Sequence, residues 1–145
     1  MTELKLLALD AEDLEVISAY VQDAVIRVGD MGFVAPENRF ACLMNRYAWE
    51  AETARGRGER RRTALHFERV KSVRITGIDQ TARDGVLDLL TVQFVETDAP
   101  AGHIDLCFAG GGTVRLEVEC IEARMKDLGA AWSAKARPDH DIGKN

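Results

Sequence analysis

Hydrophobic and polar residues alternate with a period of two along much of the chain. In residues 103–108 every second side chain is apolar, and residues 113–118 repeat this alternation. Side chains on a β-strand point alternately to its two faces, so each segment predicts a strand with one face in the core. The glycines at positions 110–112 lie between the two segments, and glycine accepts the positive φ values of tight turns. Together these residues predict an antiparallel hairpin.

The N-terminal part of the chain has a helical period instead. Leu14, Ile17 and Val21 recur at a spacing that places them on one side of a helix. Asp10 precedes them and suits the N-cap position, because its carboxylate can accept hydrogen bonds from the free amides of the first helical turn. We therefore expect a helix over residues 10–22.

The period changes again at the end of the predicted hairpin. Val118, Ile121, Met125 and Leu128 fit one helical stripe, and Gly129 fits a helix C-cap. This pattern predicts a second helix over residues 119–128 that packs on the sheet.

Other segments carry strand patterns. Residues 26–33 change phase at Gly29, which predicts a tight turn or a bulge there. Residues 50–61 contain two glycines and no useful period, and we interpret them as a mobile loop. Further strands are predicted over residues 39–47, over residues 86–95, and over residues 62–76 with a kink at 69–72.

This order of elements predicts a mainly antiparallel α+β fold. Six to seven strands with short turns should form a strongly curved sheet or a partly open barrel, with one helix near each end of the chain. A bent sheet capped by a C-terminal helix is similar to pleckstrin-homology-like barrels, and this analogy concerns the fold alone. We expect one globular domain over residues 1–132 and a flexible tail over residues 133–145.

Size, charge and cysteine usage point to an ordinary cytoplasmic domain. The chain has 145 residues and a formal net charge of -5, so general attraction to nucleic acids or anionic membranes is not expected. No secretory signal and no long apolar run are visible in the sequence. Cys42, Cys107 and Cys120 are odd in number and widely spaced, which favours reduced thiols.

Arginines are concentrated in the predicted loop. Arg55, Arg57, Arg60 and Arg61 could bind an acidic protein surface or a phosphate-bearing ligand, because guanidinium groups pair bidentately with oxyanions. The alternative is a solvated loop without a dedicated partner. Nucleic acid is not the expected partner, since few aromatic residues accompany the arginines.

A ligand pocket inside the curved sheet is the second hypothesis. His66, His103 or Trp49 could line such a pocket in an enzyme or small-ligand binder. No catalytic motif is present to support it. His103 and Cys107 would lie about 13 Å apart on a strand, too far to chelate one zinc ion, so we expect neither a metal nor a cofactor.

Five segments resemble a bacterial family, Domain of Unknown Function 2948. The resemblance covers nearly the whole chain and implies a bacterial cytosolic protein, but it implies no catalytic residue, cofactor or substrate. An antiparallel scaffold, no catalytic motif and one charged loop lead us to expect a non-enzymatic binding or adaptor domain. Its partner and its oligomeric state stay open, and a homo-oligomer is possible. The segments are residues 7–14, 45–50, 64–67, 108–112 and 118–123.

Overall fold

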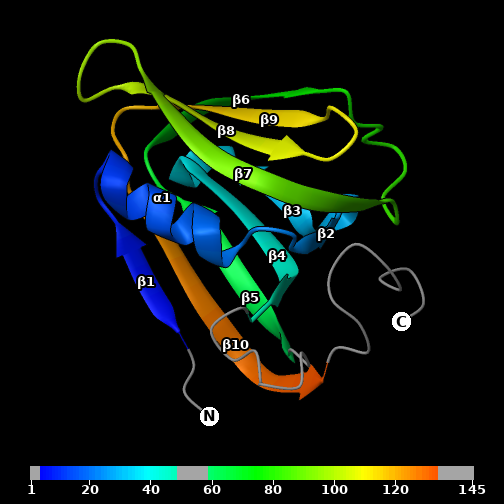
Figure 1. The fold of residues 1–145 in the computed structure, drawn as a ribbon. Coiled ribbons are helices and arrows are strands. Elements are labelled where there is room, and N and C mark those ends of the chain that lie inside the picture. Colours follow the sequence, from blue (N-terminus) through cyan, green and yellow to red (C-terminus); the bar gives the residue numbers. More distant parts are fainter. Residues whose placement is uncertain (1–3, 49–58, 134–145) are drawn as a thin grey trace.

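The computed structural model describes residues 4–48 and 59–133, which contain ten β-strands, one α-helix and two short 3-10 helices (Figure 1). The elements are β1 (Lys5–Ala8), α1 (Ala11–Tyr20), β2 (Val25–Arg27), η1 (Val28–Asp30), β3 (Met31–Val34), η2 (Ala35–Glu37), β4 (Arg39–Tyr47), β5 (Glu59–Phe67), β6 (Val70–Thr76), β7 (Val86–Glu96), β8 (Gly102–Phe108), β9 (Thr113–Val118) and β10 (Ala123–Ser133).

All strand pairs are antiparallel, and the strands follow one path of hydrogen-bonded neighbours. The order is β1-β10-β5-β4-β2-β7-β8-β9-β6, and β3 pairs with β4 beside this path. The sheet is not closed, because the path begins at β1 and ends at β6. The prediction of a mainly antiparallel fold is confirmed, whereas the predicted number of six to seven strands is too low.

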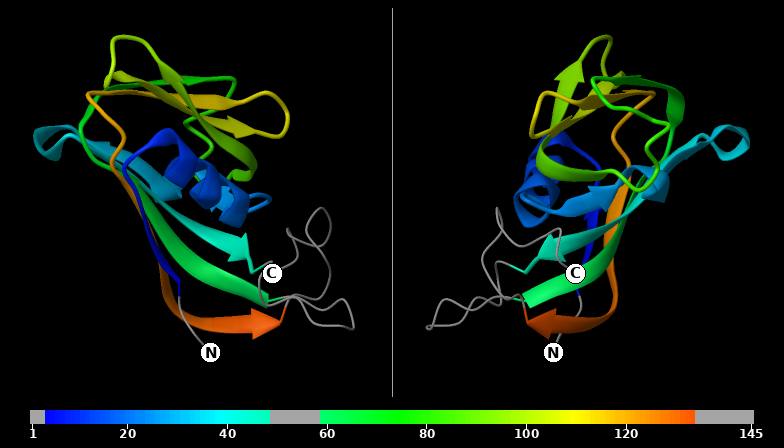
Figure 2. Two further views of the ribbon diagram at one scale, coloured as in Figure 1. Left: turned by 60° about the vertical axis from the view of Figure 1, so that its left-hand side comes forward. Right: turned by 90° about the vertical axis from the view of Figure 1, so that its right-hand side faces the viewer.

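The sheet bends sharply where β5 passes into β6 and β9 into β10. Arg69 takes a φ of 61° between β5 and β6, and the pairing of β6 with β9 shifts register between Val70 and Ser72. The Glu68 amide donates to the Glu122 carbonyl oxygen at 2.8 Å, which keeps the two chain segments together through the bend. The kink predicted at residues 69–72 is therefore present, and it divides the sheet into two halves around one core (Figure 2).

The predicted C-terminal helix is wrong, because residues 123–133 form the strand β10. Ala123, Met125 and Asp127 point inward and are at most 1% exposed, whereas Leu128 is 47% exposed. The alternation was hidden in the sequence because one inward residue is charged. Gly129, interpreted as a helix cap, lies in a register shift of β10 with a φ of 152°, a conformation that glycine tolerates. The comparison with pleckstrin-homology-like barrels relied on this helix and is not confirmed.

The N-terminal helix is present and covers the core. Asp10 is its N-cap and accepts a hydrogen bond from the Asp13 amide at 2.8 Å. The predicted stripe of Leu14, Ile17 and Val21 is buried. Helix α1 lies across the concave side of the sheet, next to β1 and β7 (Figure 1), so it seals the core from that side.

Candidate functional site

The outer face of β1, β10, β5 and β4 carries a group of basic side chains. Arg124 lies opposite His66 across the β10–β5 pair, and Lys126 lies opposite Lys5 across the β1–β10 pair. Directly opposite residues in antiparallel strands point to the same face, so these side chains share one surface. We call this surface the basic face. Its residues are Lys5, Arg39, Arg62, His66, Arg124 and Lys126.

The centre of the basic face is smooth because small residues occupy it. Ala64 separates Lys126 of β10 from Leu43 of β4, and Ala41 lies opposite His66. Small side chains leave room above the strands, so an approaching partner could contact the long basic side chains and the sheet together.

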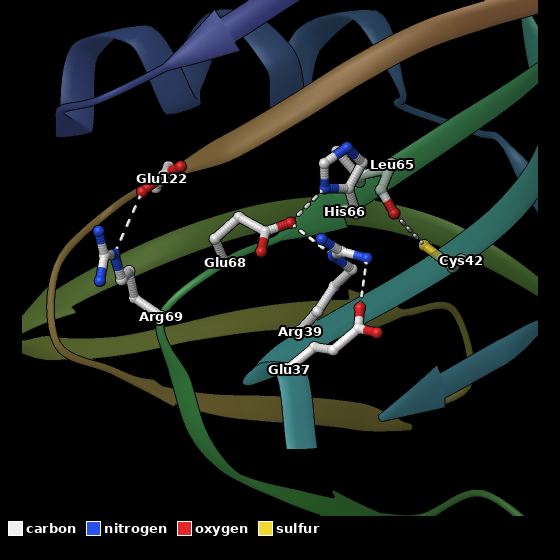
Figure 3. A network of polar contacts seen from close by, with 8 residues as sticks. All are labelled: Glu37, Arg39, Cys42, Leu65, His66, Glu68, Arg69 and Glu122. Carbon is white, nitrogen blue, oxygen red and sulfur yellow. Dashed lines mark hydrogen bonds and ion pairs between the residues drawn. The ribbon is translucent and has the colours of Figure 1, made fainter. Parts of the chain in front are cut away.

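The acidic residues that touch this face pair with basic side chains of β4 and β5, and Figure 3 shows the group around Glu68. His66 Nδ1 and Arg39 Nε lie 2.7 and 2.8 Å from Glu68 Oε2, and Arg39 Nη1 also donates to Glu37 at 2.7 Å. Asp30 lies 3.7 Å from Arg62. Within the described part of the chain, Lys5, Arg124 and Lys126, on the strands β1 and β10, make no ion pair and remain available to an anion.

The cluster around Glu68 is organised by charge. Partial burial disfavours the charged form of Glu68, but hydrogen bonds from Arg39 and His66 outweigh this effect and hold the pKa of the carboxyl below its ordinary value of 4.5. The same bond raises the pKa of Arg39. Glu68 is therefore ionised at neutral pH and orients Arg39 and His66 at the edge of the face.

A shallow cavity of about 680 Å³ opens beside this cluster. Its wall is mainly apolar and contains Gly32, Ala41, Leu43 and Ala64, and its polar lining includes Asp30, Arg39 and His66. Cys42 also contributes, but burial raises the pKa of its thiol to about 12, and the thiol lies 3.6 Å from the Leu65 carbonyl oxygen. A protonated buried thiol is a poor nucleophile, so Cys42 is not suited to covalent catalysis in this cavity.

The predicted binding arginines are not all in a loop. Strand β5 begins at Glu59, so the loop prediction is wrong for Arg60 and Arg61, which are 8% and 3% exposed. Arg60 donates to the Asn45 carbonyl oxygen at 2.9 Å and lies over the Tyr47 ring. Arg55 and Arg57 lie outside the described residues.

The predicted pocket residues are not brought together. His66 lines the cavity, but His103 lies on β8 in the other half of the sheet, with its Nε2 atom 3.9 Å from Asp105. Trp49 lies outside the described residues, as do the positions of the predicted tail beyond residue 133.

A buried polar cluster lies beneath the basic face, and it was not predicted from the sequence. Asp127 accepts hydrogen bonds from Arg46 at 2.9 and 2.8 Å, from the Thr63 hydroxyl at 2.8 Å and from the Leu4 amide at 3.0 Å. Arg46 and Asp127 are 0% exposed, and Arg46 also lies over the Tyr20 ring. The sequence did contain one indication of this cluster. Residues 123–127 alternate with a period of two, and this period places Asp127 on the inward face with Ala123 and Met125.

The chain matches the family model described as a protein of unknown function (DUF2948) over residues 4–140. The chain belongs to the DUF2948 family. No match was found among curated proteins or among solved structures. The described part of this DUF2948 protein contains no helix long and apolar enough to cross a membrane. Nor do its described residues include a group of three or more metal-ligating side chains.

Proposed function

We propose that this DUF2948 domain is a non-enzymatic binding module that recognises an anionic partner through its basic face. The observation that carries the proposal is the arrangement of Lys5, Arg124 and Lys126 on adjacent strands without acidic partners. Like charges directly opposite each other weaken a sheet, so their presence favours a role that needs the charge. The chain as a whole is acidic, with a formal net charge of -5, which makes this face a local exception.

The proposal changes the residues expected to bind the partner. Arg60 and Arg61 are buried and are replaced in it by Arg62, which is 41% exposed at the same end of β5. Arg55 and Arg57 stay in the proposal as predicted contacts. A bacterial cytoplasmic location, in which the chain acts as an adaptor, also stays a proposal and is supported by the family resemblance.

Charge reversal on the basic face tests the proposal. We expect the double variant Arg124→Glu and Lys126→Glu to lose binding to immobilised poly-glutamate at low salt, measured by biolayer interferometry. Inorganic polyphosphate, as a second probe, distinguishes a phosphate-bearing partner from an acidic protein. Added salt should weaken the wild-type binding to either probe, because the charges concerned are exposed.

The double variant Lys71→Glu and Arg74→Glu is a matched control. It also replaces one lysine and one arginine, but both residues are exposed on β6, in the other half of the sheet. Both double variants should keep the melting temperature of the wild type. Equal loss of binding in the two variants would show that only the overall charge matters, and it would overturn the assignment to the basic face.

The cavity beside Glu68 supports a second candidate function, the binding of a small anionic ligand. Arg39 and His66 lie at the edge of a mainly apolar space of about 680 Å³, which is within the range of small-ligand sites. Gly32→Leu should fill this space, since a Cβ at Gly32 meets no atom within 4 Å. The variant should keep its fold and lose the thermal stabilisation that a library of small carboxylic acids gives to the wild type. Unchanged stabilisation would exclude the cavity.

A further inference from the structure

Two strand edges, those of β3 and β6, face each other across a cleft that is lined by both apolar and polar residues. Strand β6 ends the path of the sheet, and β3 pairs with β4 alone, so each has one edge without a strand partner among the described residues. A cleft of about 360 Å³ lies between them. Its lining includes Met31 and Phe33 from β3, Val73 and Ile75 from β6, and Ile78. We call it the edge cleft.

Main-chain hydrogen bonds hold the edge cleft open at a fixed width. At one end the Val70 amide donates to the Asn38 carbonyl oxygen at 2.9 Å. At the other end the Gly29 amide donates to the Arg83 carbonyl oxygen at 2.8 Å. Since Val70 begins β6 and Asn38 follows β3, the two edges run in opposite directions between these bonds. The cleft is thus formed before any partner binds, which lowers the entropic cost of binding.

The second half of β6 has few of the devices that usually protect an edge strand. Proteins guard free edges with charged side chains, especially lysines, and with prolines and bulges. Of these devices, residues 73–76 contain only the charged side chain of Arg74. Lys71 and the register shift between Val70 and Ser72 occupy the beginning of β6. Residues 73–76 pair regularly with β9 and contain neither lysine nor proline. Strand β3 also contains neither lysine nor proline. An extended segment can therefore add to these edges by ordinary main-chain pairing.

We propose that the edge cleft binds an extended segment of a partner protein in which apolar and acidic residues alternate. The segment pairs with residues 73–76 of β6, and every second side chain enters the cleft beside Val73 and Ile75. The intervening side chains lie on the outer side with Arg74, which is exposed and has no ion pair in the described part of the chain. Arg83 lines the cleft as a further basic residue. Opposite charges across a strand pair are favourable, so the intervening residues are acidic.

The charges of β6 also argue against a second copy of the chain as the occupant. Pairing of two β6 edges would bring Lys71 and Arg74 of both copies onto one surface, where they repel. The edge cleft shares Met31 and Gly32 with the cavity beside Glu68, but the pairing edge is β6, which carries none of the basic-face residues, so this inference does not depend on the proposed function.

A seven-residue peptide, the length of β6, tests the inference. The probe alternates valine and glutamate and has blocked ends. Added to the ¹⁵N-labelled protein, it should shift the amide resonances of residues 73–76 and of Met31–Val34 most, and slow their hydrogen exchange. A peptide of the same composition with its valines grouped together, and one with N-methylated valines, should not bind.

The two double variants described above separate this site from the basic face. Lys71→Glu with Arg74→Glu should weaken peptide binding roughly tenfold, because the cross-strand attraction of the peptide to Arg74 becomes a repulsion and Lys71→Glu adds a second negative charge to the same strand. Arg124→Glu with Lys126→Glu should leave it unchanged. The inference is overturned if the peptide shifts no β6 amide at millimolar concentration, if the grouped peptide binds equally well, or if the free protein dimerises through β6.

Discussion

Two arginine–aspartate pairs in this protein share one hydrogen-bond geometry and differ in their surroundings. Arg46 donates to the two carboxylate oxygens of Asp127 at 2.9 and 2.8 Å, and Arg115 donates to those of Asp105 at 2.9 and 3.0 Å. The first pair is 0% exposed on both side chains, whereas the Arg115 side chain is 42% exposed. Geometry alone therefore does not decide what such a pair contributes; access to water does.

The buried pair contributes mainly to the specificity of the fold. Removing two charges from water costs free energy that their mutual attraction only partly returns. Asp127, however, joins strands β10, β5 and β4 through Arg46 and Thr63, and it also holds the Leu4 amide before β1. A slip of β10 by one residue would turn Asp127 outward and leave Arg46 without this carboxylate, so the pair fixes the register of the strand.

Truncation of the buried aspartate should have the largest effect on stability. Asp127→Ala should lower the free energy of unfolding by roughly 3–5 kcal/mol, because it leaves the buried Arg46 charge without its carboxylate. Urea denaturation followed by circular dichroism measures the change. A loss no greater than that of Asp105→Ala would refute the distinction between the two pairs.

The buried pair of Arg46 and Asp127 should also affect how the stability of the protein depends on pH. Burial disfavours ionised Asp127, but hydrogen bonds from Arg46, the Leu4 amide and Thr63 hold its pKa below the ordinary value of 3.8. A lowered folded-state pKa adds stability above the pKa of the unfolded carboxyl, and this stability is lost as the pH falls through the folded-state value. Carboxyl groups titrate between roughly pH 5 and pH 2. Over this range the free energy of unfolding of the wild type should fall more than that of Asp127→Asn. Parallel curves for the two proteins would contradict the assignment.

The three cysteines should differ in their reactivity, because one lies in the interior and two lie near the surface. Cys42 is buried with a pKa raised to about 12, whereas Cys107 and Cys120 are partly exposed. Iodoacetamide at mild alkaline pH should therefore modify Cys107 and Cys120 first and reach Cys42 only when the protein unfolds. Peptide mass spectrometry over time gives the order, and early modification of Cys42 would show that β4 opens locally.

The smallest effect is expected at the pair of Asp105 with the half-exposed Arg115. Asp105→Ala leaves Arg115 free to be hydrated, so the melting temperature should change little. High salt should reduce even that small difference, since the Arg115 side chain is 42% exposed. A salt-independent loss would mean that Asp105 acts through packing on β8 instead.

The parts of the fold that were predictable from sequence are those with local causes. The cap at Asp10, the turn at residues 110–112 and the phase change at Gly29 each arise from neighbouring residues, and each is present, the last as η1. Strand β10 was missed because its inward Asp127 is satisfied by Arg46, 81 residues earlier in the chain. No local pattern indicates such a partner.

The candidate site was only partly predictable for the same reason. Arg60 appeared to be a loop residue because its charge suggests solvent, yet it is held by the Asn45 carbonyl oxygen and the Tyr47 ring on the neighbouring strand. The basic face joins Lys5 to Lys126, and only the strand order brings these residues together. His66 lines a cavity on the outer face of the sheet, not the pocket inside the curved sheet that was predicted, and His103 lies on β8, away from that cavity.

The position of β10 has a consequence for how the protein is made. Strand β1 pairs only with β10 among the described strands, and β10 also lies along β5. A chain emerging from the ribosome thus carries β1 without its partner until β10 is synthesised. The closure of so long a stretch of chain is entropically costly, so we expect folding to be completed late and slowly. During synthesis, β1 and β5 expose edges that chaperones are suited to protect.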